Sequence, residues 1–261
     1  MIRQHAQFYL NGYPVAIDLP PPTQEVMEGV RWGHCDELFT AAFWRVQFEL
    51  QTRHGRYSKH SLGRSLNEEV AACMLGGYGI PAEMGMLAFH RLRDLNLLNG
   101  CSSVKCLESA LAAPFESNGK LRRYRFPKQK AVYLAPILQT LTVDSLPQGD
   151  LELRNYLLTL NGIGPKTASW VVRNFRNSPD VAIIDVHIFR AGKMAGVFDA
   201  TDDPAANYFS MEFRFLKFCR AIGVHANVLD AIIWDYMRQI GPTKVHSGAP
   251  KKIAAQYAMA I

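Results

Sequence analysis

The sequence predicts a mostly α-helical fold that begins with a short β-hairpin. Apolar residues recur with the helical period over most of the chain after residue 23, whereas strict alternation occurs only near the start. With 48% hydrophobic residues among 261, the chain can fill a substantial core. We therefore expect a globular protein with one large domain or two compact ones.

The hairpin is predicted from the N-terminal stretch QFYLNGYPVAIDLPPP. Apolar residues alternate on both sides of Asn11-Gly12, a dipeptide that favours a tight turn, and three prolines end the stretch. Residues 1–22 are therefore expected to form a hairpin and a linker. Helices are expected between Gly, Pro, Asn and Ser turns, at residues 36–51, 66–75, 81–95, 103–112, 128–141, 150–160, 166–175, 207–222 and 225–240.

Composition and charge exclude several classes of protein. No apolar run reaches the roughly 18 residues of a membrane span, and the N-terminus lacks the apolar core of a signal peptide. The five cysteines are scattered, with no Cys-x-x-Cys pair and no histidine at the spacing of zinc ligands. We expect reduced thiols, no metal and a cytoplasmic location, with association to the nucleoid in a prokaryote. The net charge of +6 permits binding to nucleic acid.

The stretch LNGIGPKTASW, residues 160–170, carries more turn chemistry than a simple break between two helices needs. Gly162 and Gly164 permit positive φ and leave backbone N–H groups uncovered, and Pro165 suits the first position of the second helix. Uncovered amides at a helix N-terminus form an anion site. In a basic protein we expect this anion to be a phosphate of nucleic acid.

This stretch and the following VAIIDVHIFR resemble the helix-hairpin-helix (HhH-GPD) DNA glycosylases, and among them the 8-oxoguanine DNA glycosylase/AP lyase branch of base excision repair. The resemblance is strongest over residues 151–190. It implies two helical subdomains with a DNA-binding cleft between them. One would comprise residues 66–175 and carry the hairpin, and the other would combine residues 23–65 with residues 176–261.

The resemblance assigns catalytic roles to Lys166 and Asp185. The lysine would attack C1′ of the damaged nucleotide, expel the base and form a Schiff base that permits strand cleavage by β-elimination. Lys166 is expected in the first turn of its helix, where the positive end of the helix dipole disfavours a protonated amine. Asp185, about twenty residues further on, would stabilise the positive charge that grows on the sugar. The alternatives are a solvated lysine and an aspartate that caps the next helix, and capping is compatible with catalysis.

Four further residues are candidates for contacts with DNA. His187 matches a histidine near the phosphate of the flipped nucleotide, or is a packed histidine. Trp170 lies one helical turn after Lys166 and could stack on an extruded base, or belong to the core. Asp230 and Trp234, again one turn apart, lie where the family places its base pocket. A carboxylate there could accept hydrogen bonds from N1–H and the N2 amino group of guanine, although the family more often has an amide.

Two other segments complete the expected DNA-binding surface. Tyr78, in MLGGYGIPAEM, could fill the hole left by the flipped base, or be a turn aromatic. The segment KLRRYRFPKQK, residues 120–130, interleaves six cations with two aromatics and could contact phosphates or form a solvated loop.

The expected partner is double-stranded DNA with a damaged base, bound by a monomer away from any membrane. No C-x6-C-x2-C-x5-C array follows Asp185, which excludes the iron–sulfur cluster of related branches. No cofactor is expected, although a monovalent cation at the hairpin is compatible with the resemblance. Two alternatives are a glycosylase of the same fold for another modified base, and a helix-hairpin-helix protein that binds DNA without catalysis. The second alternative would need the hairpin but neither Lys166 nor Asp185.

Overall fold

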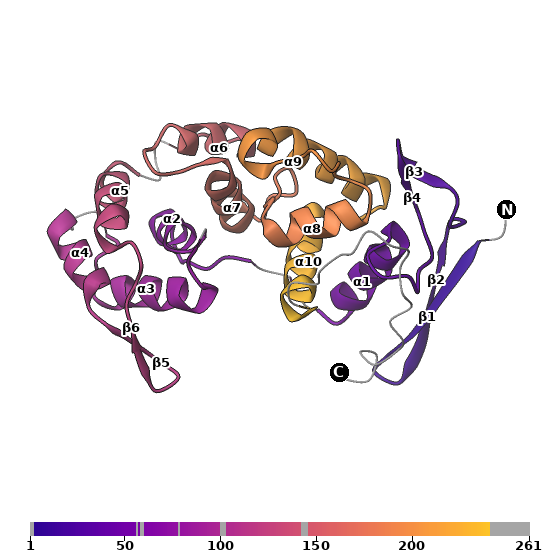
Figure 1. The fold of residues 1–261 in the computed structure, drawn as a ribbon, viewed down its shortest axis with the longest axis horizontal. Helices are drawn as coiled ribbons and strands as arrows, with labels where there is room; N and C mark the ends of the chain where they lie inside the picture. The colour runs from indigo at the N-terminus through magenta and orange to yellow at the C-terminus, as the bar shows by residue number, and fades with distance from the viewer. Residues whose placement is uncertain are drawn as a thin grey trace.

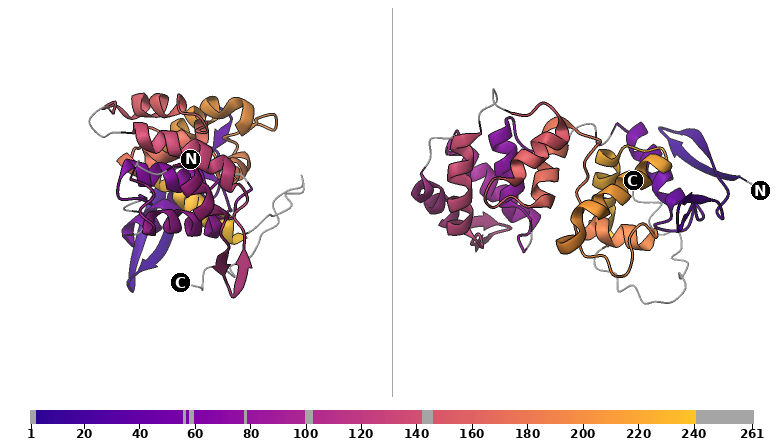
Figure 2. Two further views of the ribbon diagram at one scale, coloured as in Figure 1. Left: turned by 90° about the vertical axis from the view of Figure 1, so that its left-hand side faces the viewer. Right: turned by 90° about the horizontal axis from the view of Figure 1, so that it is seen from above.

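The computed structural model describes residues 3–55, 57, 60–77, 79–99, 103–141 and 146–240. Two helical lobes lie side by side along the longest axis of the molecule (Figure 1), and Figure 2 shows the same division from above. The fold is mostly α-helical, as predicted. None of the described helices is both long and apolar enough to cross a lipid bilayer.

The predicted N-terminal hairpin is present. Strands β1 (Gln4–Leu10) and β2 (Tyr13–Leu19) pair in antiparallel fashion. Asn11 and Gly12 have φ values of 51° and 84°, and positive φ at both central residues is what a type I′ turn requires. The turn predicted from these two residues therefore sets the register of the strands.

A second hairpin and the first helix follow. β3 (Glu25–Met27) pairs with β4 (Val30–Arg31), and these strands are too short to produce a recognisable alternation in the sequence. α1 (Ala41–Arg53) begins later than the expected helix at 36–51. The reason is the side chain of Thr40, which accepts a hydrogen bond from an amide of the first turn and caps the helix there.

The first lobe is helical with one exception. Its helices are α2 (Leu66–Leu75), α3 (Ala82–Asp94), α4 (Val104–Ala112), α5 (Pro127–Thr140), α6 (Asp150–Leu158) and α7 (Pro165–Arg176). The exception is a hairpin of β5 (Phe115–Ser117) and β6 (Lys120–Arg122), which projects from the lobe (Figure 1). The sequence predicted no element between the helices expected at 103–112 and 128–141, and the hairpin forms there because Asn118 and Gly119 adopt positive φ and turn the chain back.

The second lobe combines α1 and the N-terminal strands with α8 (Val186–Met194), α9 (Pro204–Ala221) and α10 (Ala226–Ile240). α10 packs against α1 and α8. α9 begins three residues before the expected segment 207–222, because Asp203 caps it and a proline occupies its first position.

Each lobe has its own hydrophobic core. The core of the first lobe is drawn from residues 66–181, and that of the second from residues 6–44 and 182–237. Over the residues that the structure describes, the chain therefore crosses between the two cores twice, after residue 57 and between Val181 and Ala182. Asp185 lies directly after the second crossing, so the fold brings it to the junction of the lobes.

Candidate active site

The predicted helix-hairpin-helix consists of α6, a turn at residues 159–164 and α7. Gly162 has a φ of +90°, and ring atoms of Tyr133 lie 2.5 Å from the position of an added Cβ, so only glycine fits. Gly164 instead has a φ of −95°, so the positive φ that the sequence permits is used by Gly162 alone. Apart from Gly164 and its two chain neighbours, no described residue has an atom within 4 Å of a Cβ built on Gly164, and none of their side chains caps α7. The N-terminus of α7 is therefore open to an anion.

Lys166 is the second residue of α7 and is half-buried. Its Nζ lies 5.8 Å from the centroid of the Trp170 ring, which is one turn further along the same face. The far edge of that ring lies against the end of α2, 3.3 Å from the position of a Cβ built on Gly76. The tryptophan thus packs on the first lobe and also lies beside the amine.

Asp185 caps α8 through one of its two carboxylate oxygens. Oδ1 accepts hydrogen bonds from the amides of His187 at 2.8 Å and Ile188 at 2.9 Å. Oδ2 accepts no hydrogen bond from any residue that the structure describes, and the side chain is half-buried. One oxygen therefore holds the helix while the other is free for a ligand, so capping and a catalytic role are compatible in this geometry.

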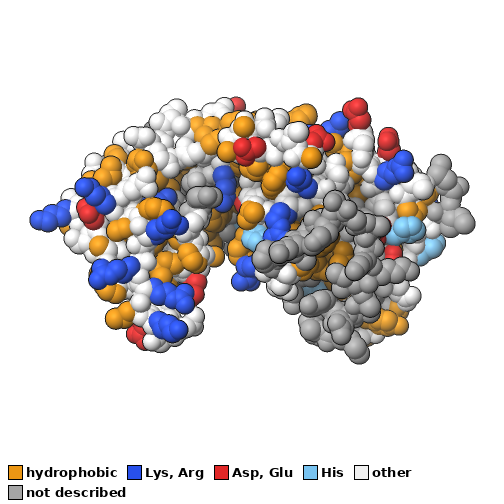
Figure 3. Space-filling view, viewed as in Figure 1, with side chains coloured by type: hydrophobic (Ala, Val, Ile, Leu, Met, Phe, Trp, Pro, Cys, Tyr) orange, Lys and Arg blue, Asp and Glu red, His pale blue; other side chains and the backbone are white. Residues whose placement is uncertain are grey.

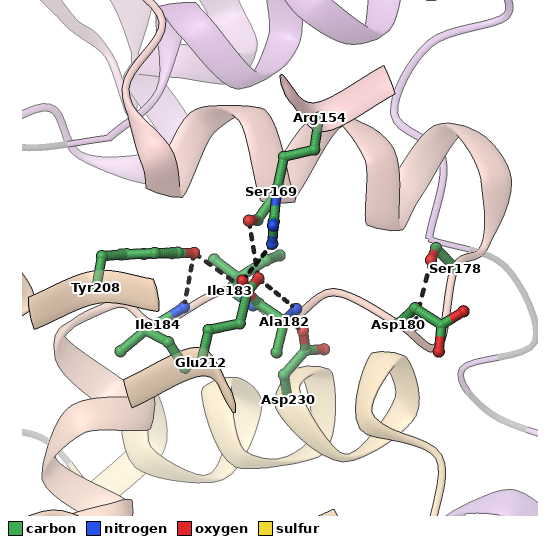
Figure 4. Close-up of polar contacts among 10 residues, drawn as sticks. All are labelled: Arg154, Ser169, Ser178, Asp180, Ala182, Ile183, Ile184, Tyr208, Glu212 and Asp230. Atoms are coloured by element: carbon green, nitrogen blue, oxygen red, sulfur yellow. Dashed lines mark hydrogen bonds and ion pairs between the residues drawn. The ribbon is translucent and has the colours of Figure 1, made fainter. Parts of the chain in front are cut away.

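Asp185 ends the linking segment, residues 177–185, which joins α7 to α8 without regular secondary structure. Side chains of α9 and α10 hold the backbone of this segment (Figure 4). Glu212 accepts from the Ala182 amide at 3.0 Å, Asp230 from the Ile183 amide at 3.4 Å, and Tyr208 from the Ile184 amide at 3.3 Å. The backbone that leads to Asp185 is therefore anchored at three successive residues.

Asp230 does not line an open base pocket, contrary to the expectation from the sequence. The residue is 2% exposed, and its carboxylate pairs with the guanidinium of Arg173 on α7. Burial raises the pKa of Asp230 to about 6, and the charge of Arg173 opposes that shift. Because the carboxylate is enclosed and already hydrogen-bonded, it is not available to the Watson–Crick edge of guanine.

His187, at the start of α8, lies beside Trp234, in the middle of α10. Their ring centroids are 6.0 Å apart in an edge-to-face arrangement, and both side chains are half-buried. The Nδ1 atom of His187 has no hydrogen-bond partner among the described residues. The structure thus joins these two predicted residues, while their contacts with DNA stay predictions.

Tyr78, the expected wedge, lies outside the described residues. Its neighbours Gly77 and Gly79 have φ values of +100° and +72°. The guanidinium of Arg125 donates to the carbonyl of Gly79 at 3.4 Å, so the basic segment lies beside this turn.

The basic segment at residues 120–130 is not a single loop. It comprises β6, a short connection in which Tyr124 is buried, and the first turn of α5. Lys120, Arg122 and Arg123 are exposed and form no ion pair with a described carboxylate. Figure 3 shows a hollow between the lobes, with Lys and Arg side chains on the first lobe and its projecting hairpin.

Comparison with known proteins identifies the family. Residues 51–224 match the family described as 8-oxoguanine DNA glycosylase. The chain belongs to this family. The 8-oxoguanine DNA glycosylase/AP lyase of Metallosphaera sedula is 31% identical over 152 residues, which cover 56% of this chain and 71% of that protein.

Solved structures of 8-oxoguanine DNA glycosylases share the fold. The Methanocaldococcus jannaschii 8-oxoguanine glycosylase/lyase, in complex with a 15mer DNA containing 8-oxoguanine, is similar with a TM-score of 0.54, 20% identity, and coverage of 76% of this chain and 89% of that one. The 8-oxoguanine DNA glycosylase of Thermotoga maritima is similar with a TM-score of 0.52 and 22% identity, and the match covers 75% of this chain and 89% of that one. A trapped endonuclease III–DNA covalent intermediate is similar with a TM-score of 0.56 and 17% identity, and the match covers 77% of this chain and 87% of that one. The helix-hairpin-helix glycosylase fold is therefore shown.

In this 8-oxoguanine glycosylase family member, residues that were not among the predicted site residues connect the two lobes. Arg154 of α6 donates to Oε2 of Glu212 at 2.5 Å, and the Ser169 hydroxyl donates to Oε1 at 2.8 Å (Figure 4). Burial raises the pKa of Glu212, and the amide of Ala182 and the charge of Arg154 oppose the shift. Sequence reasoning missed Glu212, and the available signal was a carboxylate on the apolar face of a helix.

Proposed function

We propose that this protein excises 8-oxoguanine from double-stranded DNA and then cleaves the strand, with Lys166 as the nucleophile. The observation that carries the proposal is the position of the amine, in the first turn of an uncapped helix that follows a glycine hairpin. Open amides at this end can hold a backbone phosphate and so bring the flipped sugar toward the amine.

The chemistry can be written with groups of the protein and the DNA alone. The lone pair of a neutral Lys166 amine attacks C1′, and the glycosidic bond breaks with its electron pair leaving on the base, which takes up a proton. The nitrogen loses one proton and its lone pair forms the C1′=N bond, while the C1′–O4′ bond breaks with its electron pair on O4′, which takes up a proton; the ring is then open and the Schiff base is protonated. Removal of a proton from C2′ lets the C–H electron pair form the C2′=C3′ bond, and the C3′–O bond breaks with its electron pair on the departing 3′ phosphate. No cofactor enters this proposal, and a monovalent cation at the hairpin stays a prediction.

The other site residues take supporting roles in this proposal. The free Oδ2 of Asp185 stabilises the positive charge that develops on the sugar as the base leaves. Trp170, whose ring lies beside the Lys166 amine, offers a surface for the extruded base. We also propose that the protein acts on DNA as a monomer in the cytoplasm, at the nucleoid if the cell is a prokaryote.

Borohydride trapping tests the proposal. Wild-type protein and a duplex with one 8-oxoguanine should give a covalent adduct, and Lys166→Gln should give neither adduct nor free base while still binding the duplex. Lys105→Gln is the matched control, because Lys105 is also the second residue of its helix, α4, and is exposed. If Lys166→Gln keeps wild-type excision, the lysine is only a DNA contact. Release of a different base from a panel of lesion duplexes would favour the alternative substrate, and release of none would favour a binding protein.

A further inference from the structure

A buried ion pair joins the helix of Lys166 to the second lobe. Arg173 lies seven residues after Lys166 on the same face of α7, or about 10 Å along the helix axis at 1.5 Å per residue. Its guanidinium pairs with the carboxylate of Asp230 on α10, and the two residues are 5% and 2% exposed. The other oxygen of Asp230 accepts from the Ile183 amide, two residues before Asp185.

The first lobe holds the guanidinium of Arg173 in one orientation. Its Nη1 donates to Oδ1 of Asn174 at 2.8 Å, and Asn174 in turn donates to Oε1 of Glu69 at 2.7 Å. The other oxygen of Glu69 accepts the amides of Leu62 and Gly63, each at 2.8 Å. A continuous chain of hydrogen bonds, buried at Glu69, Asn174, Arg173 and Asp230 and partly buried at its two ends, therefore runs from the first lobe to the linking segment.

Stability alone does not account for this arrangement. A buried ion pair gains little net free energy, because the desolvation of both charges offsets their attraction, and well-packed apolar residues often serve as well or better. A pair that is also hydrogen-bonded on both sides does specify one relative position of its two elements. Here α7 carries Lys166, and Asp230 of α10 bonds the linking segment that ends at Asp185.

We propose that Asp230 is a positioning residue: paired with Arg173 and bonded to the Ile183 amide, it sets the place of Asp185 relative to Lys166. This inference rests on the proposed function, because it concerns the two residues assigned to the reaction. Asp230 acts through Asp185 and does not touch the DNA. Its effect is therefore confined to the step that needs Asp185, the departure of the base.

Two substrates separate this step from Schiff-base formation. With saturating enzyme, Asp230→Asn should release 8-oxoguanine at least tenfold more slowly than wild type. Borohydride trapping on a duplex with a preformed abasic site needs Lys166 but no base departure, and it should stay within twofold of wild type. In protein that already carries Asp185→Asn, the Asp230→Asn change should lower the rate of 8-oxoguanine release by less than a further twofold, because the carboxylate that Asp230 positions is already absent.

The matched control is Asp235→Asn, on the same helix. Asp235 accepts a hydrogen bond from Tyr57 at 2.6 Å, a contact within the second lobe, and its substitution should leave both rates unchanged. Equal losses of excision and trapping in Asp230→Asn, or a full additional loss in the Asp185→Asn background, would overturn the inference.

A second variant covers the case in which Asp230→Asn does not fold, which circular dichroism would reveal. Arg173→Lys keeps the charge but lacks the planar fork that bonds Asp230 and Asn174 together. It should show the same selective loss of excision, at a smaller factor, and an unselective loss again contradicts the inference. If wild-type protein itself releases no 8-oxoguanine and gives no adduct, the proposed function fails first.

Discussion

Gly162 and Gly164 have opposite backbone requirements although a single residue separates them. Gly162 needs a φ of +90° beside the Tyr133 ring, whereas Gly164 has a φ of −95° and open space at its Cβ position. The two glycines of one motif therefore serve different purposes, the turn itself and the access of DNA to the helix N-terminus.

This difference predicts opposite outcomes for two substitutions. Gly164→Val should fold with wild-type stability and bind both lesion and undamaged duplexes more weakly, because its side chain blocks the approach of the phosphate. Gly162→Ala should lower the free energy of unfolding by about 1–3 kcal/mol through strain and crowding. Urea unfolding and duplex titration at one fixed salt concentration measure both effects. If Gly164→Val binds both duplexes as tightly as wild type, the hairpin does not bind a backbone phosphate of the DNA.

The roles of the two Asp185 oxygens, capping α8 and stabilising charge on the sugar, can be distinguished by substitution with Asn and with Ala. Asp185→Asn keeps an oxygen that can cap α8 but loses the charge, so excision should slow at least tenfold, or about 1.4 kcal/mol, with little change in stability. Asp185→Ala should also lose about 0.5–2 kcal/mol of stability with the cap. Asp203→Asn is the control, because Asp203 caps α9 in the same manner. Unchanged single-turnover rates in Asp185→Asn would assign this residue to capping alone.

The exposed cations of the β5–β6 hairpin should contact phosphates. The base of the hairpin is anchored by the guanidinium of Arg91, 3.3 Å from the centroid of the Phe115 ring. The double variant Lys120→Gln and Arg122→Gln should weaken binding to all duplexes alike. The slope of log affinity against log salt concentration should become shallower by the amount expected for the loss of about two phosphate contacts.

The matched control for that pair removes the same two charges from α9. Lys217 and Arg220 are exposed there, and Lys217→Gln with Arg220→Gln should leave the salt dependence unchanged. Equal effects of the two double variants would mean that only the net charge matters, and that residues 120–130 form a solvated surface.

Stability should depend on pH through Asp230. Its pKa is raised from 3.8 to about 6, so between about pH 4 and pH 6 the native state holds a proton that the unfolded state has released. The free energy of unfolding contributed by this group therefore falls as the pH rises through that window. Burial lowers the pKa of His60 to about 4 from 6.5, which produces the opposite slope.

A difference measurement isolates the contribution of Asp230. Urea unfolding of wild type and Asp230→Asn across the window should show the variant gaining stability relative to wild type as the pH rises, because only wild type loses the bound proton. Burial, the larger cause of the lowered pKa of His60, is common to both proteins, so its contribution to the slope cancels in the comparison. Parallel pH profiles would mean that the charge of Arg173 compensates fully for the burial of the carboxylate.

The sequence was sufficient wherever conformation depends on neighbouring residues. The helical period predicted α2 within its observed bounds, and Asn11-Gly12 predicted a hairpin turn, since each feature depends on local dihedral preferences. The placement of Lys166 at the start of α7 follows likewise from the glycines and the proline before it. A two- or three-residue strand such as β5 offers too few residues for a pattern, so the sequence predicted no strand there.

By itself, then, the sequence determined the helices, the hairpin motif and the chemical groups at Lys166 and Asp185. Only the tertiary structure decided what faces each helix. The period of α10 puts Asp230 one turn from Trp234, but it does not say that Arg173, 57 residues earlier in the chain, lies opposite. Whether a carboxylate receives a ligand or a partner from its own chain depends on the packing of distant segments, and the burial of Asp230 against α7 settled that question.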